Sequence, residues 1–151
     1  MNIIKLVRTN SQHQDLKLLV KELDSYLKVT DGDEHKFYDK YNHLSSINHF
    51  VVAFWNEEPA GCGAFKIFDD DSIEIKRMFT KSKFRRNHIG AKILKELEDW
   101  AKEEGFTSSV LETGIRQKGA VKFYLKNNYC RIDNYGQYIG KTNSLCFKKS
   151  L

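Results

Sequence analysis

The stretch KFRRNHIGAKILKELEDW, residues 83–100, sets two arginines directly before an amphipathic pattern. Apolar residues recur in it every three or four positions, which predicts a helix, and Gly105 is a typical helix stop. The first turn of a helix carries free backbone N–H groups and the positive end of the helix dipole. Arg85 and Arg86 add positive charge at that point. The stretch therefore predicts a binding site for an anion, most often a phosphate group.

The segments on either side of this helix read as β-strands. IEIKRMFT at 73–80 precedes it, and SSVLET at 108–113 follows it. A strand, a helix and a second strand in this order form a right-handed crossover, so the two strands should be parallel. Strict alternation along 73–80 would place Ile73, Ile75 and Arg77 on one face, and Glu74, Lys76 and Met78 on the other.

The rest of the chain predicts a mixed α/β (α+β) fold, with a mostly antiparallel central sheet flanked by helices. A single proline, no internal repeat and no linker indicate one domain over residues 1–151. Further strands are expected at 3–7, 49–55, 61–68, 129–132 and 144–149, and further helices at 12–28, about 34–43 and 117–127.

Composition limits the class of function. The net charge of +5 suits an anionic ligand. No helix shows a one-sided basic stripe with interleaved aromatics, so nucleic-acid binding is not favoured. The three cysteines form no CxxC pair, which argues against a disulfide framework and a zinc site, and no metal is expected. Without a signal-like start or a membrane-length apolar run, the expected location is the cytoplasm.

Spacing alone leaves two interpretations of the arginine-rich loop open. Gly90 lets a ligand approach the backbone closely because it has no Cβ. Alternatively, Gly90 packs the helix against the sheet, and the arginines are merely solvated.

A resemblance favours the first interpretation. Residues 74–114 look like the central segment of the GNAT superfamily of acyl-CoA-dependent N-acetyltransferases, whose loop signature is Gln or Arg, two residues, Gly, one residue, then Gly or Ala. Arg85 matches its first position and Gly90 its last, whereas His88 replaces the usual first glycine. QKGAVKFYLKNNY at 117–129 resembles the following helix of the family. Its matching residues are Ala120, Phe123, Tyr124 and Tyr129. The tail from Asn134 resembles one uncharacterised bacterial group in this superfamily.

The resemblance implies that acetyl-CoA is the co-substrate, bound where the parallel strands splay apart. Its pyrophosphate would lie on the loop and the helix start, and its pantetheine arm would pair with the backbone around Met78. The implied CoA-binding residues are Met78, Phe79, Thr80, Arg85, Arg86, Asn87, His88, Ile89, Gly90, Ala91, Gln117, Ala120 and Tyr124.

Two residues are candidates for the chemistry. Tyr124 would protonate the departing thiolate, and Glu74 would draw the proton from the attacking amine. The alternatives are that Tyr124 is a packing residue and that Glu74 forms a surface ion pair with Lys76 or a lysine of a neighbouring strand.

The acceptor is expected to be a primary amine of a small molecule or a peptide, and a homodimer is left open. The resemblance directs attention to Tyr38 and to Tyr135, Gln137 and Tyr138 of the late loop as acceptor-binding candidates. These loop tyrosines could equally cover the edge of the core. A non-catalytic, CoA-binding regulatory module is the main alternative function, and a basic nucleic-acid-binding protein is a weaker one.

Overall fold

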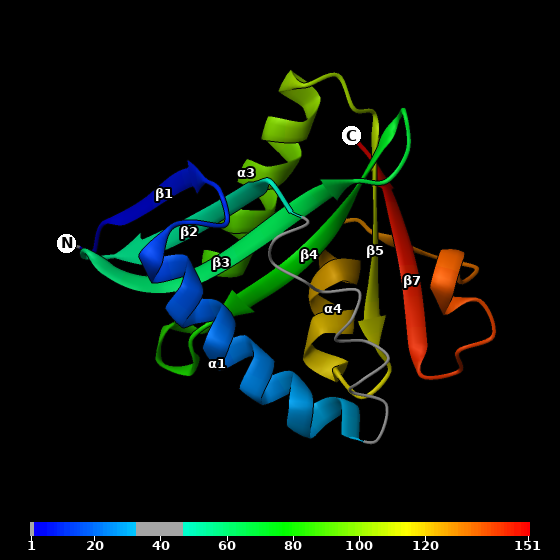
Figure 1. Ribbon diagram of the computed structural model, residues 1–151, viewed down its shortest axis with the longest axis horizontal. Coiled ribbons are helices and arrows are strands. Elements are labelled where there is room, and N and C mark those ends of the chain that lie inside the picture. The colour runs from blue at the N-terminus through cyan, green and yellow to red at the C-terminus, as the bar shows by residue number, and fades with distance from the viewer. Residues whose placement is uncertain (1, 33–46) are drawn as a thin grey trace.

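A computed structural model of the chain describes residues 2–32 and 47–151, and within them it forms one mixed sheet covered by helices on both faces (Figure 1). The strands lie in the order β1-β2-β3-β4-β5-β7-β6. The strand bounds are β1 Ile4–Thr9, β2 His49–Trp55, β3 Glu58–Ile67, β4 Ser72–Thr80, β5 Ser108–Gly114, β6 Cys130–Ile132 and β7 Ser144–Ser150. The helices are α1 Gln14–Asp31, α3 Ile89–Glu103 and α4 Lys118–Lys126, with short 3-10 turns η3 Ser82–Phe84 and η4 Gly136–Tyr138.

The parallel pair predicted from the sequence is confirmed, and it is short. β4 and β5 pair only over residues 72–74 and 108–110, while all the other strand pairs are antiparallel. Beyond that point β4 continues to Thr80 and β5 to Gly114 without pairing to each other. The sheet therefore splits between β4 and β5, as Figure 1 shows.

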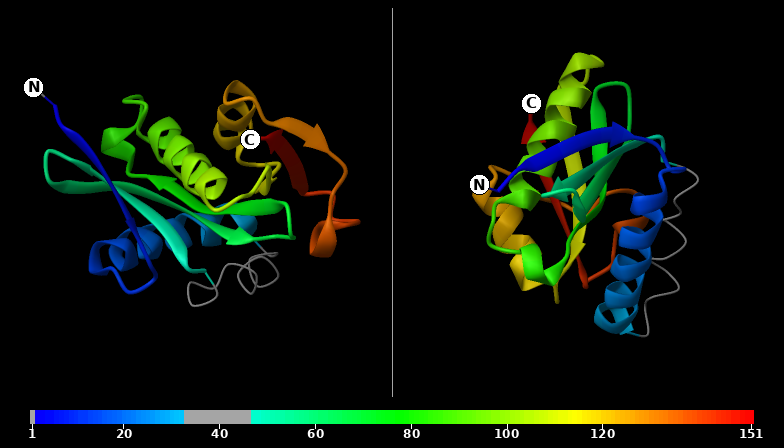
Figure 2. Two further views of the ribbon diagram at one scale, coloured as in Figure 1. Left: turned by 90° about the horizontal axis from the view of Figure 1, so that it is seen from above. Right: turned by 90° about the vertical axis from the view of Figure 1, so that its left-hand side faces the viewer.

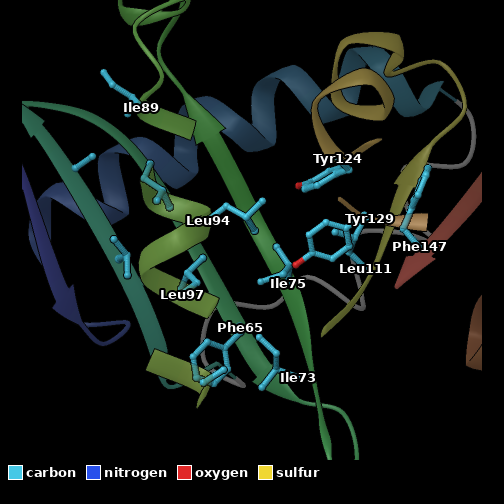
Figure 3. Packing of buried hydrophobic residues seen from close by; sticks show 14 of the residues in the cluster. Phe65, Ile73, Ile75, Ile89, Leu94, Leu97, Leu111, Tyr124, Tyr129 and Phe147 are labelled. Atoms are coloured by element: carbon cyan, nitrogen blue, oxygen red, sulfur yellow. The ribbon is translucent and has the colours of Figure 1, made fainter. Parts of the chain in front are cut away.

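The helices divide between the two faces of the sheet (Figure 2). α3 and α4 cover one face, where the stripe of α3 packs with Phe65, Ile73 and Tyr124 in the main core (Figure 3). α1 covers the opposite face and buries Leu16 and Leu19 against β2 and β3. Helical spacing of apolar residues explains both packings.

Two of the predicted helices differ from the elements that the structure describes. α1 runs one turn beyond the predicted helix 12–28, to Asp31. The expected short helix at about 34–43, with Tyr38, lies outside the described residues.

The expected alternation along β4 is wrong at Arg77. Cys62 pairs with Phe79 but Ala64 pairs with Lys76, so two residues of β4 oppose the single residue Gly63. This is a β-bulge, and Arg77 within it adopts a left-handed φ of 58°.

The bulge reverses the side of the sheet to which the side chains of Arg77 and the following residues point. Arg77 turns toward α1 and pairs with Asp24, away from the face of Ile73 and Ile75. Met78 packs on the α3 face, where a Cβ at Gly63 would collide with its sulfur. Met78 therefore does not share the face of Glu74, as strict alternation would require.

Candidate active site

A cavity of about 840 Å³ occupies the split in the sheet. Its walls come from α1, the C-terminal end of β4, the loop before α3, the start of α3 and α4. Of the thirteen predicted CoA-binding residues, twelve line it: Met78, Phe79, Thr80, Arg85, Arg86, His88, Ile89, Gly90, Ala91, Gln117, Ala120 and Tyr124. Residues that the sequence analysis did not predict to bind CoA line it as well: Leu23, Tyr26, Phe84, Arg116, Lys118, Gly119, Phe123, Lys126 and Asn127.

Asn87, the thirteenth predicted residue, has a different position. Its side-chain amide donates to the carbonyls of Phe84 and Arg85, at 3.0 and 3.1 Å. These bonds hold the turn that leads into α3. Asn87 therefore shapes the loop and does not line the cavity.

The start of α3 offers backbone donors to the cavity. The first helical bond runs from the N–H of Lys92 to the carbonyl of His88, at 3.1 Å. The N–H groups of Ile89, Gly90 and Ala91 precede it and so have no partner within the helix. The first turn contains no acidic residue, and this charge pattern suits an anion.

Gly90 has a packing reason as well as a binding reason. A Cβ at this position would lie 3.3 Å from the ring of Phe123 and 3.7 Å from Oγ1 of Thr80. The absence of a side chain thus lets α4 come close to the start of α3. The two interpretations of Gly90 are therefore compatible, because Phe123 and Thr80 both line the cavity.

His88 takes a backbone conformation that glycine adopts more easily. Its φ of 61° and ψ of 18° lie in the left-handed region, which histidine tolerates better than β-branched residues do. We expect His88→Gly to leave the affinity for acetyl-CoA nearly unchanged, because any contact made by the backbone N–H survives. Thermal unfolding should show equal or slightly higher stability, since relief of about 1–2 kcal/mol of strain is partly offset by glycine entropy.

His88→Val is the matched variant. Valine at this φ should lower the free energy of unfolding by more than about 1 kcal/mol. A large loss of acetyl-CoA affinity in His88→Gly would instead assign the imidazole itself to the ligand.

Tyr124 lies in the cavity wall with only 7% of its surface exposed. Its ring packs edge-on against Phe123 and Tyr129, with centroids 5.1 and 5.7 Å away. Figure 3 shows its hydroxyl end on the side of the ring that faces β4. Burial raises the pKa of Tyr124 above its ordinary value, and the charge of Glu112 raises it further. The phenol is thus neutral at physiological pH and can donate a hydrogen bond.

Glu74 is buried on the α1 face of β4 and does not line the cavity. Tyr135 donates a hydrogen bond of 2.6 Å to its carboxylate, and the ammonium group of Lys76 lies 3.7 Å away. Lys76 in turn donates to the hydroxyl of Tyr138 at 3.3 Å. We call these four residues the buried polar cluster. Glu74 thus forms the ion pair with Lys76 that the alternative interpretation expected, but this pair is buried and not on the surface.

The late loop lies against this cluster. Tyr138 is 2% exposed, and Tyr135 stacks edge-on against Phe68 with ring centroids 4.9 Å apart. The side-chain amide of Asn134 donates to three loop carbonyls at 3.0 to 3.1 Å. Tyr135 and Tyr138 thus cover the sheet, while Gln137 is half-buried. An acceptor-binding role for these three residues stays a prediction.

Glu112 is a charged residue that the sequence analysis missed. It stands two residues beyond the last β5 residue paired to β4, as Lys76 does on β4. The two side chains therefore face each other at one level across the opening split. Burial lowers the pKa of Lys76, and the charges of Glu74 and Glu112 oppose this. An acid directly after the buried apolar residues Val110 and Leu111 was the available signal.

Residues 2–32 and 47–151 contain neither a candidate metal site nor a membrane-spanning helix. No group of three or more His, Cys, Asp or Glu side chains there could hold a metal ion. No helix in the same ranges has the length and apolarity needed to cross a membrane.

Comparison with known proteins gives a consistent pattern. The model of the acetyltransferase (GNAT) family matches residues 16–129. A protein of Azospirillum brasilense named IAA acetyltransferase is 30% identical over 156 residues, covering 98% of each chain.

Among solved structures, a Klebsiella pneumoniae protein regarded as an acyl-CoA N-acyltransferase has a TM-score of 0.82 at 22% identity, covering 99% of this chain and 98% of its own. A GNAT family acetyltransferase from Elizabethkingia anophelis, solved with acetyl-CoA bound, has a TM-score of 0.72 at 22% identity, covering 98% of both chains. At such identities the structural likeness shows the fold.

Proposed function

Because this chain belongs to the GNAT acetyltransferase family and is an acyltransferase, we propose that it moves the acetyl group of acetyl-CoA to a primary amine by direct attack. The observation that carries the proposal is the cavity in the sheet split. It has a cationic loop and a helix start at one side, and the hydroxyl-bearing ring of Tyr124 in its wall. This combination suits a ligand with phosphate groups at one end and a reacting centre at the other.

The residues of the cavity fit acetyl-CoA. Arg85 and Arg86, with the N–H groups of residues 89–91, would hold the pyrophosphate. The edge of β4 from Met78 to Thr80 has no β5 partner, so it would pair with the amide groups of the pantetheine arm. When bound, acetyl-CoA supplies an acetyl group activated as a thioester.

Proton movement would involve the residues at the split. A lysine-like amine has a free pKa of about 10.4, so it must lose a proton before it attacks. Glu112 stands where β4 and β5 have separated, and its charge is one cause that raises the pKa of both Tyr124 and Lys76. We assign to Glu112 the acceptance of that proton, and to Tyr124 a hydrogen bond to the sulfur that leaves. Glu74, held by Tyr135, would position the loop.

A charge reversal tests the phosphate-binding part of the proposal. Arg85→Glu should weaken acetyl-CoA binding by about tenfold to a hundredfold, because an attractive charge becomes a repulsive one. Calorimetric titration with acetyl-CoA measures this. Lys5→Glu makes the same charge change on exposed β1 and should leave the affinity unchanged. Unchanged affinity in Arg85→Glu would show that the phosphates lie elsewhere.

Release of free CoA over a panel of amines tests the transferase activity. Turnover of at least one amine is expected. Tight acetyl-CoA binding without turnover of any amine would favour the regulatory module over an enzyme.

A further inference from the structure

Among the residues that the structure describes, the charged side chains that line the cavity are cationic. Five arginines and lysines of residues 2–32 and 47–151 line it, together with His88, and no aspartate or glutamate from these ranges does so. These five are Arg85, Arg86, Arg116, Lys118 and Lys126. The cavity as a whole is therefore built for anionic groups.

These cations lie toward two different ends of the cavity. Gly90 approaches Phe123, so the C-terminal half of α4, with Lys126, adjoins the phosphate-binding loop. Arg116 stands two residues before the first residue of α4, whereas Lys126 is the last residue of that helix, about 12 Å from the first along the helix axis. Its guanidinium donates to the carbonyl of Thr30 in α1, at 3.2 Å.

The contact with α1 places Arg116 on the far side of the sheet. α1 covers the face opposite α3 and α4, and its residues Leu23 and Tyr26 also line the cavity. The cavity thus passes through the split from one face to the other. Arg116 stands at its α1-side mouth, away from Arg85 and Arg86.

The proposed co-substrate accounts for the first group of cations only. Its charges are on its phosphates, whereas its pantetheine arm and acetyl group are neutral. Arg116 has five N–H donors in a planar fork. Beyond the bond to Thr30, it forms no ion pair with any acid in the described part of the chain.

We propose that Arg116, at the α1-side mouth of the cavity, binds a carboxylate of the acceptor, so that the acceptor is an amine that also carries a carboxylate, as an amino acid does. The inference rests on the transferase function proposed above and names its substrate class. An arginine fork matches a carboxylate through two parallel hydrogen bonds. Tyr26, beside it, offers a ring that is 43% exposed for the body of such a molecule.

Product analogues test this without turnover. N-acetyl derivatives of glycine, phenylalanine and glutamate, each paired with its C-terminal amide, are titrated by calorimetry into the protein saturated with CoA. For at least one pair the wild-type protein should bind the carboxylate about tenfold to a hundredfold more tightly than the amide, and Arg116→Gln should remove that preference. Lys122→Gln, an exposed change on α4 outside the cavity wall, should keep it.

Other outcomes would overturn the inference. No pair with a preference for the carboxylate, or a preference that survives in Arg116→Gln, would do so. If Arg116→Gln instead abolishes discrimination between CoA and 3′-dephospho-CoA, the arginine belongs to the phosphate of the co-substrate. A lower melting temperature with the preference intact would make it only a cap on the end of α1. Failure of the transferase function would appear separately, as no release of CoA with any amine.

Discussion

Tyr124→Phe should lower kcat by about a hundredfold or more while leaving the affinity for acetyl-CoA nearly unchanged. The ring stays in the core between Phe123 and Tyr129, and only the hydroxyl in the cavity wall is lost. A hydrogen bond that forms to the leaving sulfur stabilises the transition state more than the bound ground state, so its loss acts on kcat. Single-turnover acetyl transfer, with binding measured separately, checks the result.

The raised pKa of Tyr124 adds a pH prediction. The ordinary pKa of tyrosine is about 10, and burial moves that of Tyr124 upward. The hydroxyl form needed as a donor therefore persists to higher pH, and activity should show no alkaline loss due to Tyr124 below about pH 10. It also makes full proton transfer to a thiolate less favourable than hydrogen bonding to it.

Tyr129→Phe is the matched control. Tyr129 is 1% exposed; its hydroxyl donates to the carboxylate of Glu98 at 2.9 Å and forms a second hydrogen bond with the hydroxyl of Ser109 at 2.8 Å, in which the serine is the donor. Its loss should cost about 1–3 kcal/mol of folding stability, with kcat little changed. Equal kcat values for the wild type and Tyr124→Phe would show that Tyr124 is only a packing residue.

The two tyrosines illustrate what periodicity predicts. Apolar spacing located α1, α3 and α4, because the burial of a helix face repeats every 3.6 residues. Twelve predicted residues line one cavity because most of them come from the end of β4, the loop and the start of α3, which follow one another in the chain, and the others come from α4 and the residue before it, next to β5. The resemblance of this part of the chain to the family, and not periodicity alone, identified them as ligand-binding residues.

The residues that sequence analysis missed come from contacts between distant segments. Leu23 and Tyr26 reach the cavity because α1 crosses the far face of the split, which no local pattern encodes. The bulge at Arg77 is equally hidden, because its only local sign is the opposing Gly63 on another strand. It moved Met78 to the face opposite Glu74.

The same geometry separates the two candidate acids. Glu74, below the sheet, already accepts a hydrogen bond from Tyr135 and lies near two lysines, Lys76 and Lys66. Glu112 points to the same face of the sheet, since Val110, two residues before it, pairs with Glu74. It stands beyond the paired part of β4 and β5, however, and its charge raises the pKa of Tyr124. Neither acid lines the cavity. An acid that takes a proton from a bound amine must lie near the reacting centre, and we assign that role to Glu112 because it stands where the split has opened.

Glu112→Gln should therefore lower kcat/KM for the amine by about 10²- to 10³-fold near neutral pH. Glutamine keeps the shape of the side chain but cannot take the proton. The loss should shrink as pH rises toward the pKa of the free amine, about 10.4 for a lysine-like acceptor, because the amine then deprotonates unaided. A pH–rate profile from pH 6 to 10, with acetyl-CoA saturating, measures this.

Glu74→Gln is the matched control, because it makes the same change in side-chain shape and charge as Glu112→Gln. It weakens the bond from Tyr135 and leaves Lys76 without its nearest carboxylate, so folding stability should fall by about 1–3 kcal/mol. Its pH–rate profile should run parallel to that of the wild type, because the proton acceptor remains. Glu74 is the base if Glu74→Gln instead shows a loss of kcat/KM that shrinks as pH rises. In that case the pH–rate profile of Glu112→Gln should run parallel to that of the wild type. That result would require the acceptor to reach the buried polar cluster, displacing Tyr135 from its carboxylate.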